Sequence, residues 1–86
     1  MRIDFSDHTE EKINLLASRG FSISKNQIVN CLKNPDKLEK GYGNRKIAQK
    51  IFDETHVIRV VFEKTKNILR VITVYPGRRK RYEDQL

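Results

Sequence analysis

Apolar residues recur at helical spacing in the first third of the chain. Asp7 and Glu10 are three positions apart, like a helix cap and its reciprocal partner, and Gly20 supplies a stop signal. The apolar residues between these signals fall on one face of a helix: Ile13, Leu16 and Ala17. We therefore expect a first helix over residues 8–19.

A second helix start follows a short connection. Ser24 and Gln27 have the spacing of a capping box. The apolar residues after Ser24 keep the helical period: Ile28, Val29 and Leu32. Pro35 disfavours helical backbone in the residue before it, so the second helix is expected over residues 25–33.

The pattern changes to strands after Pro35. Segments rich in β-branched and aromatic residues are separated by short polar connections, which antiparallel neighbours allow. They are a short edge strand at 37–42 and three longer strands at 45–52, 56–64 and 68–75. We expect an α+β fold with two N-terminal helices packed on one face of a three- to four-stranded antiparallel sheet. Residues 77–86 then form a basic tail, either as a short helix or as a mobile segment.

Two registers are compatible with the connection between the last two strands. In the first, which we favour, Asn67 is left-handed in a three-residue loop and Arg59 lies opposite Thr73. In the second, a two-residue loop places Glu63 opposite Arg70 as a cross-strand ion pair. The first register turns Arg59, Thr73 and Tyr75 outward and directs another set toward the helices: Ile58, Val60, Ile72 and Val74.

Positive charge is concentrated in the second half of the chain. At 86 residues the chain is expected to form a single domain over residues 1–86, with a formal net charge of +7. Residues 1–43 hold 7 Lys/Arg and 6 Asp/Glu, whereas residues 44–86 hold 11 and 5. A lopsided field of this kind is typical of proteins that face nucleic acid or an anionic membrane surface, although a small domain can be basic without such a partner.

Other classes of site find little support. Cys31 lies among apolar positions of the second helix and is expected to be a core residue. Two histidines, one cysteine and no clustered carboxylates make no metal-ligand pattern, and no cofactor motif is recognised. The N-terminal residues lack an apolar signal-peptide core, and no segment approaches the roughly 18 apolar residues of a membrane span. We therefore expect a cytoplasmic protein that does not bind a membrane.

Short motifs along the chain carry a resemblance to a known family. They are "FSDH" before the first helix, "RGFS" between the helices, "NP" closing the second helix, and "VITVYP" in the last strand. From about Ile3 to Tyr82, their order resembles a small domain-of-unknown-function family of bacteria and archaea. That family is placed near the RelE-like ribonuclease toxins, including the BrnT and HigB types. The resemblance implies the helix-on-sheet fold described above and metal-free RNA cleavage on the exposed sheet face.

Independently of the resemblance, the chemistry of RNA cleavage selects candidate residues. Cleaving RNA without a metal needs a base for the 2′-hydroxyl, cations for the phosphate and an acid for the leaving oxygen. Arg59 matches, by position, the strand arginine that RelE-like toxins aim at the phosphate, and Arg81 with Tyr82 resembles their C-terminal pair. The predicted catalytic residues are His8, Arg59, Thr73 and Tyr82, and the predicted RNA-binding residues are Lys46, Tyr75, Arg78, Arg79, Lys80 and Arg81.

Each candidate also has a structural interpretation. His8 could be an exposed residue of a first helical turn, Arg59 a solvated strand arginine, and Thr73 simply a good strand residue. If Arg59 instead binds the phosphate from this exposed face, Arg59→Ala is expected to leave the fold intact. Tyr75 and Tyr82 could be packing residues with wet hydroxyls, and residues 78–81 a solvated tail.

Three functions follow from these observations. We favour a metal-independent endoribonuclease, the toxin of a toxin–antitoxin pair, acting on free RNA or ribosome-bound messenger RNA and held inactive by an antitoxin protein. One alternative is a nonenzymatic nucleic-acid-binding domain that uses the same basic face. Another is a protein-interaction module for an acidic partner.

Overall fold

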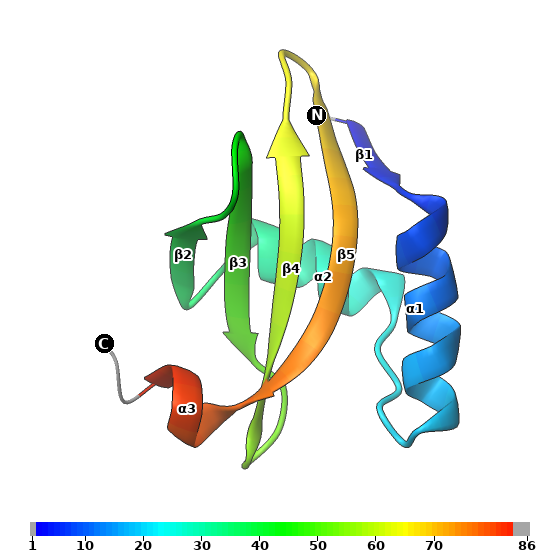
Figure 1. Ribbon diagram of the computed structural model, residues 1–86, viewed down its shortest axis with the longest axis vertical. Coiled ribbons are helices and arrows are strands. Elements are labelled where there is room, and N and C mark those ends of the chain that lie inside the picture. The colour runs from blue at the N-terminus through cyan, green and yellow to red at the C-terminus, as the bar shows by residue number, and fades with distance from the viewer. Residues whose placement is uncertain (1, 84–86) are drawn as a thin grey trace.

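The computed structural model describes residues 2–83 and shows an α+β fold built on one mixed sheet (Figure 1). The strand order in this five-stranded sheet is β1-β5-β4-β3-β2. Figure 1 shows α2 crossing behind the sheet and α1 running beside β5. In chain order the elements are β1 (Arg2–Phe5), α1 (Asp7–Ser18), α2 (Lys25–Lys33), β2 (Lys37–Lys40), β3 (Arg45–Ile51), β4 (His56–Lys64), β5 (Ile68–Arg78) and α3 (Arg79–Glu83).

The capping residues define where both N-terminal helices begin. Helix α1 starts after Ser6, whose Oγ accepts a hydrogen bond from the Thr9 backbone N–H at 3.1 Å, so the expected cap at Asp7 is wrong by one position. The capping box of Ser24 and Gln27 is confirmed, and α2 has its expected bounds. None of the helices in residues 2–83 is both long and apolar enough to span a bilayer.

The sheet is larger than expected and is not wholly antiparallel. Strands β2 to β5 form the expected antiparallel series. Strand β1 was not predicted, and it pairs with β5 in parallel, with Arg2 beside Ile68 and Phe5 beside Val71. Its four residues are too few to give a periodic signal, and they gain their hydrogen bonds from a strand 66 positions away in the chain.

A β-bulge sets the register between β4 and β5. Near the hairpin, Glu63 lies opposite Arg70, as in the second of the two registers considered. The register then shifts by one residue, so that Val61 lies opposite Thr73 and Arg59 opposite Tyr75. The favoured register is therefore wrong, and the alternative holds only at the hairpin end. Residue 72 is the additional residue of the bulge.

The start of α1 binds the backbone at this bulge. The Ser6 N–H donates to the Val71 carbonyl at 3.0 Å, and the Ser6 hydroxyl donates to the Ile72 carbonyl at 2.9 Å. Thr9, which is fully buried, donates from Oγ1 to the Val71 carbonyl at 3.2 Å. The helix cap thus supplies hydrogen-bond donors to two carbonyls at the bulge, where the ladder is interrupted.

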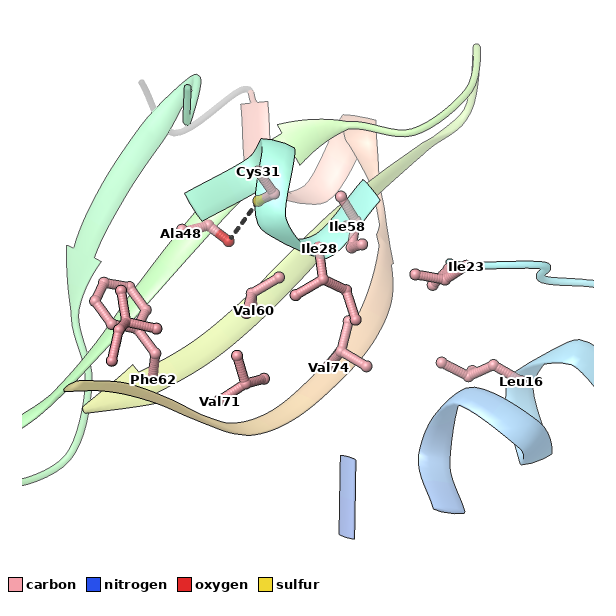
Figure 2. Close-up of a cluster of buried hydrophobic side chains, with 11 residues drawn as sticks. Leu16, Ile23, Ile28, Cys31, Ala48, Ile58, Val60, Phe62, Val71 and Val74 are labelled. Carbon is pink, nitrogen blue, oxygen red and sulfur yellow. Dashed lines mark hydrogen bonds between the residues drawn. The ribbon is translucent and has the colours of Figure 1, made fainter. Parts of the chain in front are cut away.

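The core lies between the sheet and the two N-terminal helices (Figure 2). The expected inward positions of Ile58, Val60 and Val74 are confirmed. Ile72 is half-buried and stands outside this cluster, because the bulge places Val71 there instead. The buried members are Leu16, Ile23, Ile28, Cys31, Ala48, Ile58, Val60, Phe62, Leu69, Val71 and Val74.

Cys31 is a core residue, as predicted. It is fully buried in α2, and its Sγ donates to the Ala48 carbonyl of β3 at 3.4 Å. Burial raises the pKa of the thiol to about 12, so it stays protonated at neutral pH and lacks the thiolate that a nucleophile needs.

Replacing Thr9 with valine tests the connection between α1 and the bulge. The substitution keeps the branched shape and removes the buried hydroxyl, so we expect the free energy of unfolding to fall by about 1–2 kcal/mol. Urea unfolding followed by circular dichroism measures this change. The matched control is Ser18→Ala, which removes an exposed hydroxyl bonded to the Leu15 carbonyl in the same helix and should change stability by under about 0.5 kcal/mol. Equal losses in the two variants would contradict the structural role of Thr9.

Candidate nucleic-acid interface

Three polar side chains line up on the sheet face opposite α1 and α2, which we call the open face. Arg59 of β4 lies directly between Gln49 of β3 and Tyr75 of β5 in the strand register. Because side chains alternate along each strand, the neighbouring Ile58 and Val60 point the other way, into the core. The bulge thus brings Tyr75, rather than the expected Thr73, next to Arg59.

The Arg59 guanidinium binds acceptors from three different strands. Its Nε donates to the Tyr75 hydroxyl at 2.9 Å, and its Nη2 donates to the Glu39 carboxylate of β2 at 2.8 Å. Its Nη1 donates to the side-chain carbonyl of Gln49. Arg59 is only 4% exposed and Gln49 only 2% exposed. The charge is therefore buried, and each of the three guanidinium nitrogens has an acceptor, as a buried cation needs in order to remain stable.

Helix α3 places Tyr82 over the face of this guanidinium. The Arg59 Cζ lies 4.2 Å from the centre of the Tyr82 ring, at cation–π distance. Gly77 makes this approach possible, because a β-carbon at that position would collide with the Tyr82 ring. We call these residues the Arg59 cluster: Glu39, Gln49, Arg59, Tyr75 and Tyr82.

Contacts from Arg79 hold the start of α3. Its backbone N–H donates to the Thr55 carbonyl at 2.9 Å, and its guanidinium lies 2.8 Å from the Glu83 carboxylate. The guanidinium also reaches the Glu54 carbonyl at 3.4 Å. Helix α3 is therefore tied to the turn before β4 as well as to the open face.

Glu39 is the charge partner of the cluster. The hydrogen bond from Arg59 lowers the pKa of Glu39 from 4.5 to about 2, and a second bond from Lys37, at 2.7 Å, acts in the same direction. Glu39 is thus ionised at neutral pH and is a weak general base. Burial disfavours the charged form of Arg59, but the bonds to Glu39 and Tyr75 outweigh it and raise the pKa of Arg59.

The expected exposure of Arg59 is wrong. A solvated strand arginine should tolerate replacement by alanine, yet here that change would leave the buried Gln49 amide and the Glu39 carboxylate without their partner. Arg59→Ala should therefore destabilise the fold. The alternative of a solvated arginine is wrong for the same reason.

The structure brings one other predicted catalytic residue, Tyr82, to Arg59. Thr73 shares the open face with Arg59 and Tyr75, as expected, but it is half-buried opposite Val61, two positions along β5 from Tyr75. His8 is exposed near the start of α1 and makes no hydrogen bond or ion pair within residues 2–83. Figure 1 shows α1 and α3 on opposite sides of the molecule, so the structure does not bring His8 to the Arg59 cluster.

The predicted RNA-binding residues divide between two faces. Lys46 is exposed but lies an odd number of positions from Gln49, so it alternates to the face opposite the Arg59 cluster. Arg79 is half-buried and paired with Glu83. The remaining cations are exposed and, among residues 2–83, form no ion pair with a carboxylate: Arg78, Lys80 and Arg81.

Glu39 and Gln49 are the members that sequence reasoning missed. Both lie in segments correctly predicted as strands, but neither stands near Arg59 along the chain. The sequence does carry a sign of their role: each is a polar residue at a position that alternates to the open face of its strand. Recognising it requires the register of three strands, which the individual segments do not fix.

Other places for a ligand are limited. Within residues 2–83, no group of three or more His, Cys, Asp or Glu side chains gathers as metal ligands would. A pocket of about 110 Å³ lies between α2 and β3, on the helix side of the sheet, lined by Gln27, Asn30, Lys50, Ile51, Phe52 and Ile58. It is smaller than the roughly 300 Å³ at which small-molecule sites begin.

Comparison with known proteins gives one match. Residues 5–76 match the model of a family described as "Domain of unknown function (DUF4258)". No curated protein and no solved structure matches the chain. The matched range includes four members of the Arg59 cluster and ends before Tyr82. The predicted membership of a domain-of-unknown-function family is thus confirmed, whereas the link to RelE-like toxins stays a prediction.

Glu39→Gln tests the charge pairing in the cluster through its pH dependence. Because folding lowers the pKa of Glu39 from 4.5 to about 2, its contribution to stability is present above pH 4.5 and is lost as pH falls toward about 2. The variant should be less stable at neutral pH, and its thermal midpoint should fall less steeply over that acidic range.

Thermal unfolding at a series of pH values measures both effects. Glu63→Gln is the matched control, since it removes a carboxylate from the ion pair with Arg45, where both side chains are at least 40% exposed. This control should keep the acidic slope of the unmodified protein. A Glu39→Gln variant with that same slope would show that Arg59 does not depend on the Glu39 charge.

Proposed function

The chain belongs to the DUF4258 family, and we propose that it binds single-stranded RNA through α3 and the adjoining end of the open face. The observation that carries this proposal is the grouping of exposed cations with an aromatic side chain. Lys80 and Arg81 are exposed in α3, Arg78 is exposed just before it, and the Arg81 Cζ lies 5.7 Å from the centre of the Tyr82 ring. Single-stranded nucleic acid is bound by this combination, in which cations contact phosphates and rings stack with bases.

The distribution of charge supports an extended polyanion as the ligand. Residues 44–86 carry most of the formal net charge of +7, and the three exposed cations stand within four consecutive positions. An acidic protein segment would also be attracted by the charge, but it would have no planar bases to stack on the planar side chains of the Arg59 cluster.

RNA cleavage by a toxin of the RelE-like kind, with an antitoxin as its partner, is a second candidate. This function is favoured because three of the predicted site residues are in contact: Arg59, Tyr75 and Tyr82. Against it, the Glu39 carboxylate is a weak base and His8 lies elsewhere, so the cluster lacks a base matched to neutral pH. Incubating labelled RNA with the protein in chelator, with and without translating ribosomes, separates cleavage from binding.

Substituting Lys80 and Arg81 together with alanine tests the RNA-binding proposal. Each lost phosphate contact should flatten the plot of log affinity against log salt by about 0.7, so the double variant should lose about 1.4 from the slope. The measurement is the affinity for a labelled single-stranded RNA at several salt concentrations, with circular dichroism as a check on folding.

The matched control replaces Lys64 and Lys66 with alanine. These lysines are also exposed and carry the same charge, but they lie at the β4–β5 hairpin, which Figure 1 shows at the opposite end of the sheet from α3. This control should keep the original slope. An unchanged slope in the α3 variant, or equal changes in both variants, would overturn the proposed interface.

A further inference from the structure

Tyr82 covers Arg59 without supplying any of its hydrogen bonds. The guanidinium donates to Glu39, Gln49 and Tyr75, and Tyr82 contributes a stacked ring. If Tyr82 moved away, these three bonds would remain, because their acceptors are on Tyr75, Gln49 and Glu39. Moving Tyr82 away therefore loses its cation–π contact with Arg59, but it leaves the hydrogen bonds of the guanidinium in place.

Helix α3 is suited to such a movement. It has five residues, none of them buried, and isolated helices of this length are not stable in water. What holds it to the sheet is the Tyr82 stack and the contacts of Arg79 described above. Short elements with little buried surface belong to the least stable parts of a fold.

The surface beneath Tyr82 has the shape and chemistry of a stacking site. Three acceptors on three strands fix the plane of the guanidinium, and the Tyr75 ring lies beside it, 5.7 Å from the Arg59 Cζ. The missing side chain at Gly77 leaves room for a ring against β5. A planar aromatic ligand could occupy this space in the way that Tyr82 does.

We infer that Tyr82 occupies a nucleobase-binding site, and that a base of bound RNA replaces it on the Arg59 guanidinium. Nucleobases are the planar groups that stack on arginine in RNA complexes. This inference rests on the proposed function and extends it, because it names the place where a base, rather than a phosphate, is bound. The cations of α3 then hold the neighbouring phosphates, and Tyr82 acts as an internal competitor.

The test compares adenosine monophosphate with ribose 5-phosphate, which carries a phosphate but no base. In Tyr82→Ala the competitor is absent, so adenosine monophosphate should bind about 3- to 30-fold more tightly than to the unmodified protein. It should also shift the NMR signal of the Arg59 Nε–H group. Ribose 5-phosphate should show neither effect. Tyr82→Phe keeps the stacked ring and should bind adenosine monophosphate like the unmodified protein.

The result that would overturn the inference is equal binding of adenosine monophosphate by the unmodified protein and Tyr82→Ala, or a gain that ribose 5-phosphate shares. Titration of the full chain with single-stranded RNA distinguishes this failure from failure of the proposed function. RNA binding that depends on Lys80 and Arg81, without a base-dependent gain, would leave the interface standing and remove the base site. Base-dependent binding at Arg59 without RNA binding would support the base site and overturn the proposed RNA interface.

Discussion

The buried guanidinium of Arg59 constrains the whole open face. A cation that is 4% exposed requires nearby acceptors, and here they come from β2, β3 and β5. Each of these strands must therefore present one particular side chain at one particular height along the sheet. The strand order and both flanking registers of β4 are needed to meet that requirement.

The β-bulge at residue 72 links this requirement to the N-terminus. If the hairpin register of β4 and β5 continued without the additional residue, Arg59 would lie opposite Val74, and Tyr75 would lie opposite the core residue Ile58. The bulge moves Tyr75 to the open face beside Arg59, and the cap of α1 binds the carbonyls at that point. One local arrangement, the bulge with the helix cap bound to it, therefore sets the position of α1, the register of β5 and the Arg59 cluster.

Local signals in the sequence were sufficient for most elements but not for their pairing. The bounds of α2 and β4 were correct because a capping box and a long β-branched segment each act within a few residues. Strand β1 and the bulge depend on contacts of residues 2–6 with residues 68–72, which no local pattern records. The burial of Arg59 could not be predicted for the same reason, since Glu39 and Gln49 reach it only after three strands have paired.

The inferred base site depends on Arg59 being held as a fixed, covered plane rather than as a solvated phosphate contact. The most direct measurement is the rate at which the Arg59 Nε–H proton exchanges with water, followed by NMR in the full chain. The account predicts much slower exchange for Arg59 than for the exposed Arg70 and Arg78, because its Nε donates to Tyr75 beneath Tyr82. Exchange at Arg59 as fast as at those two arginines would contradict it.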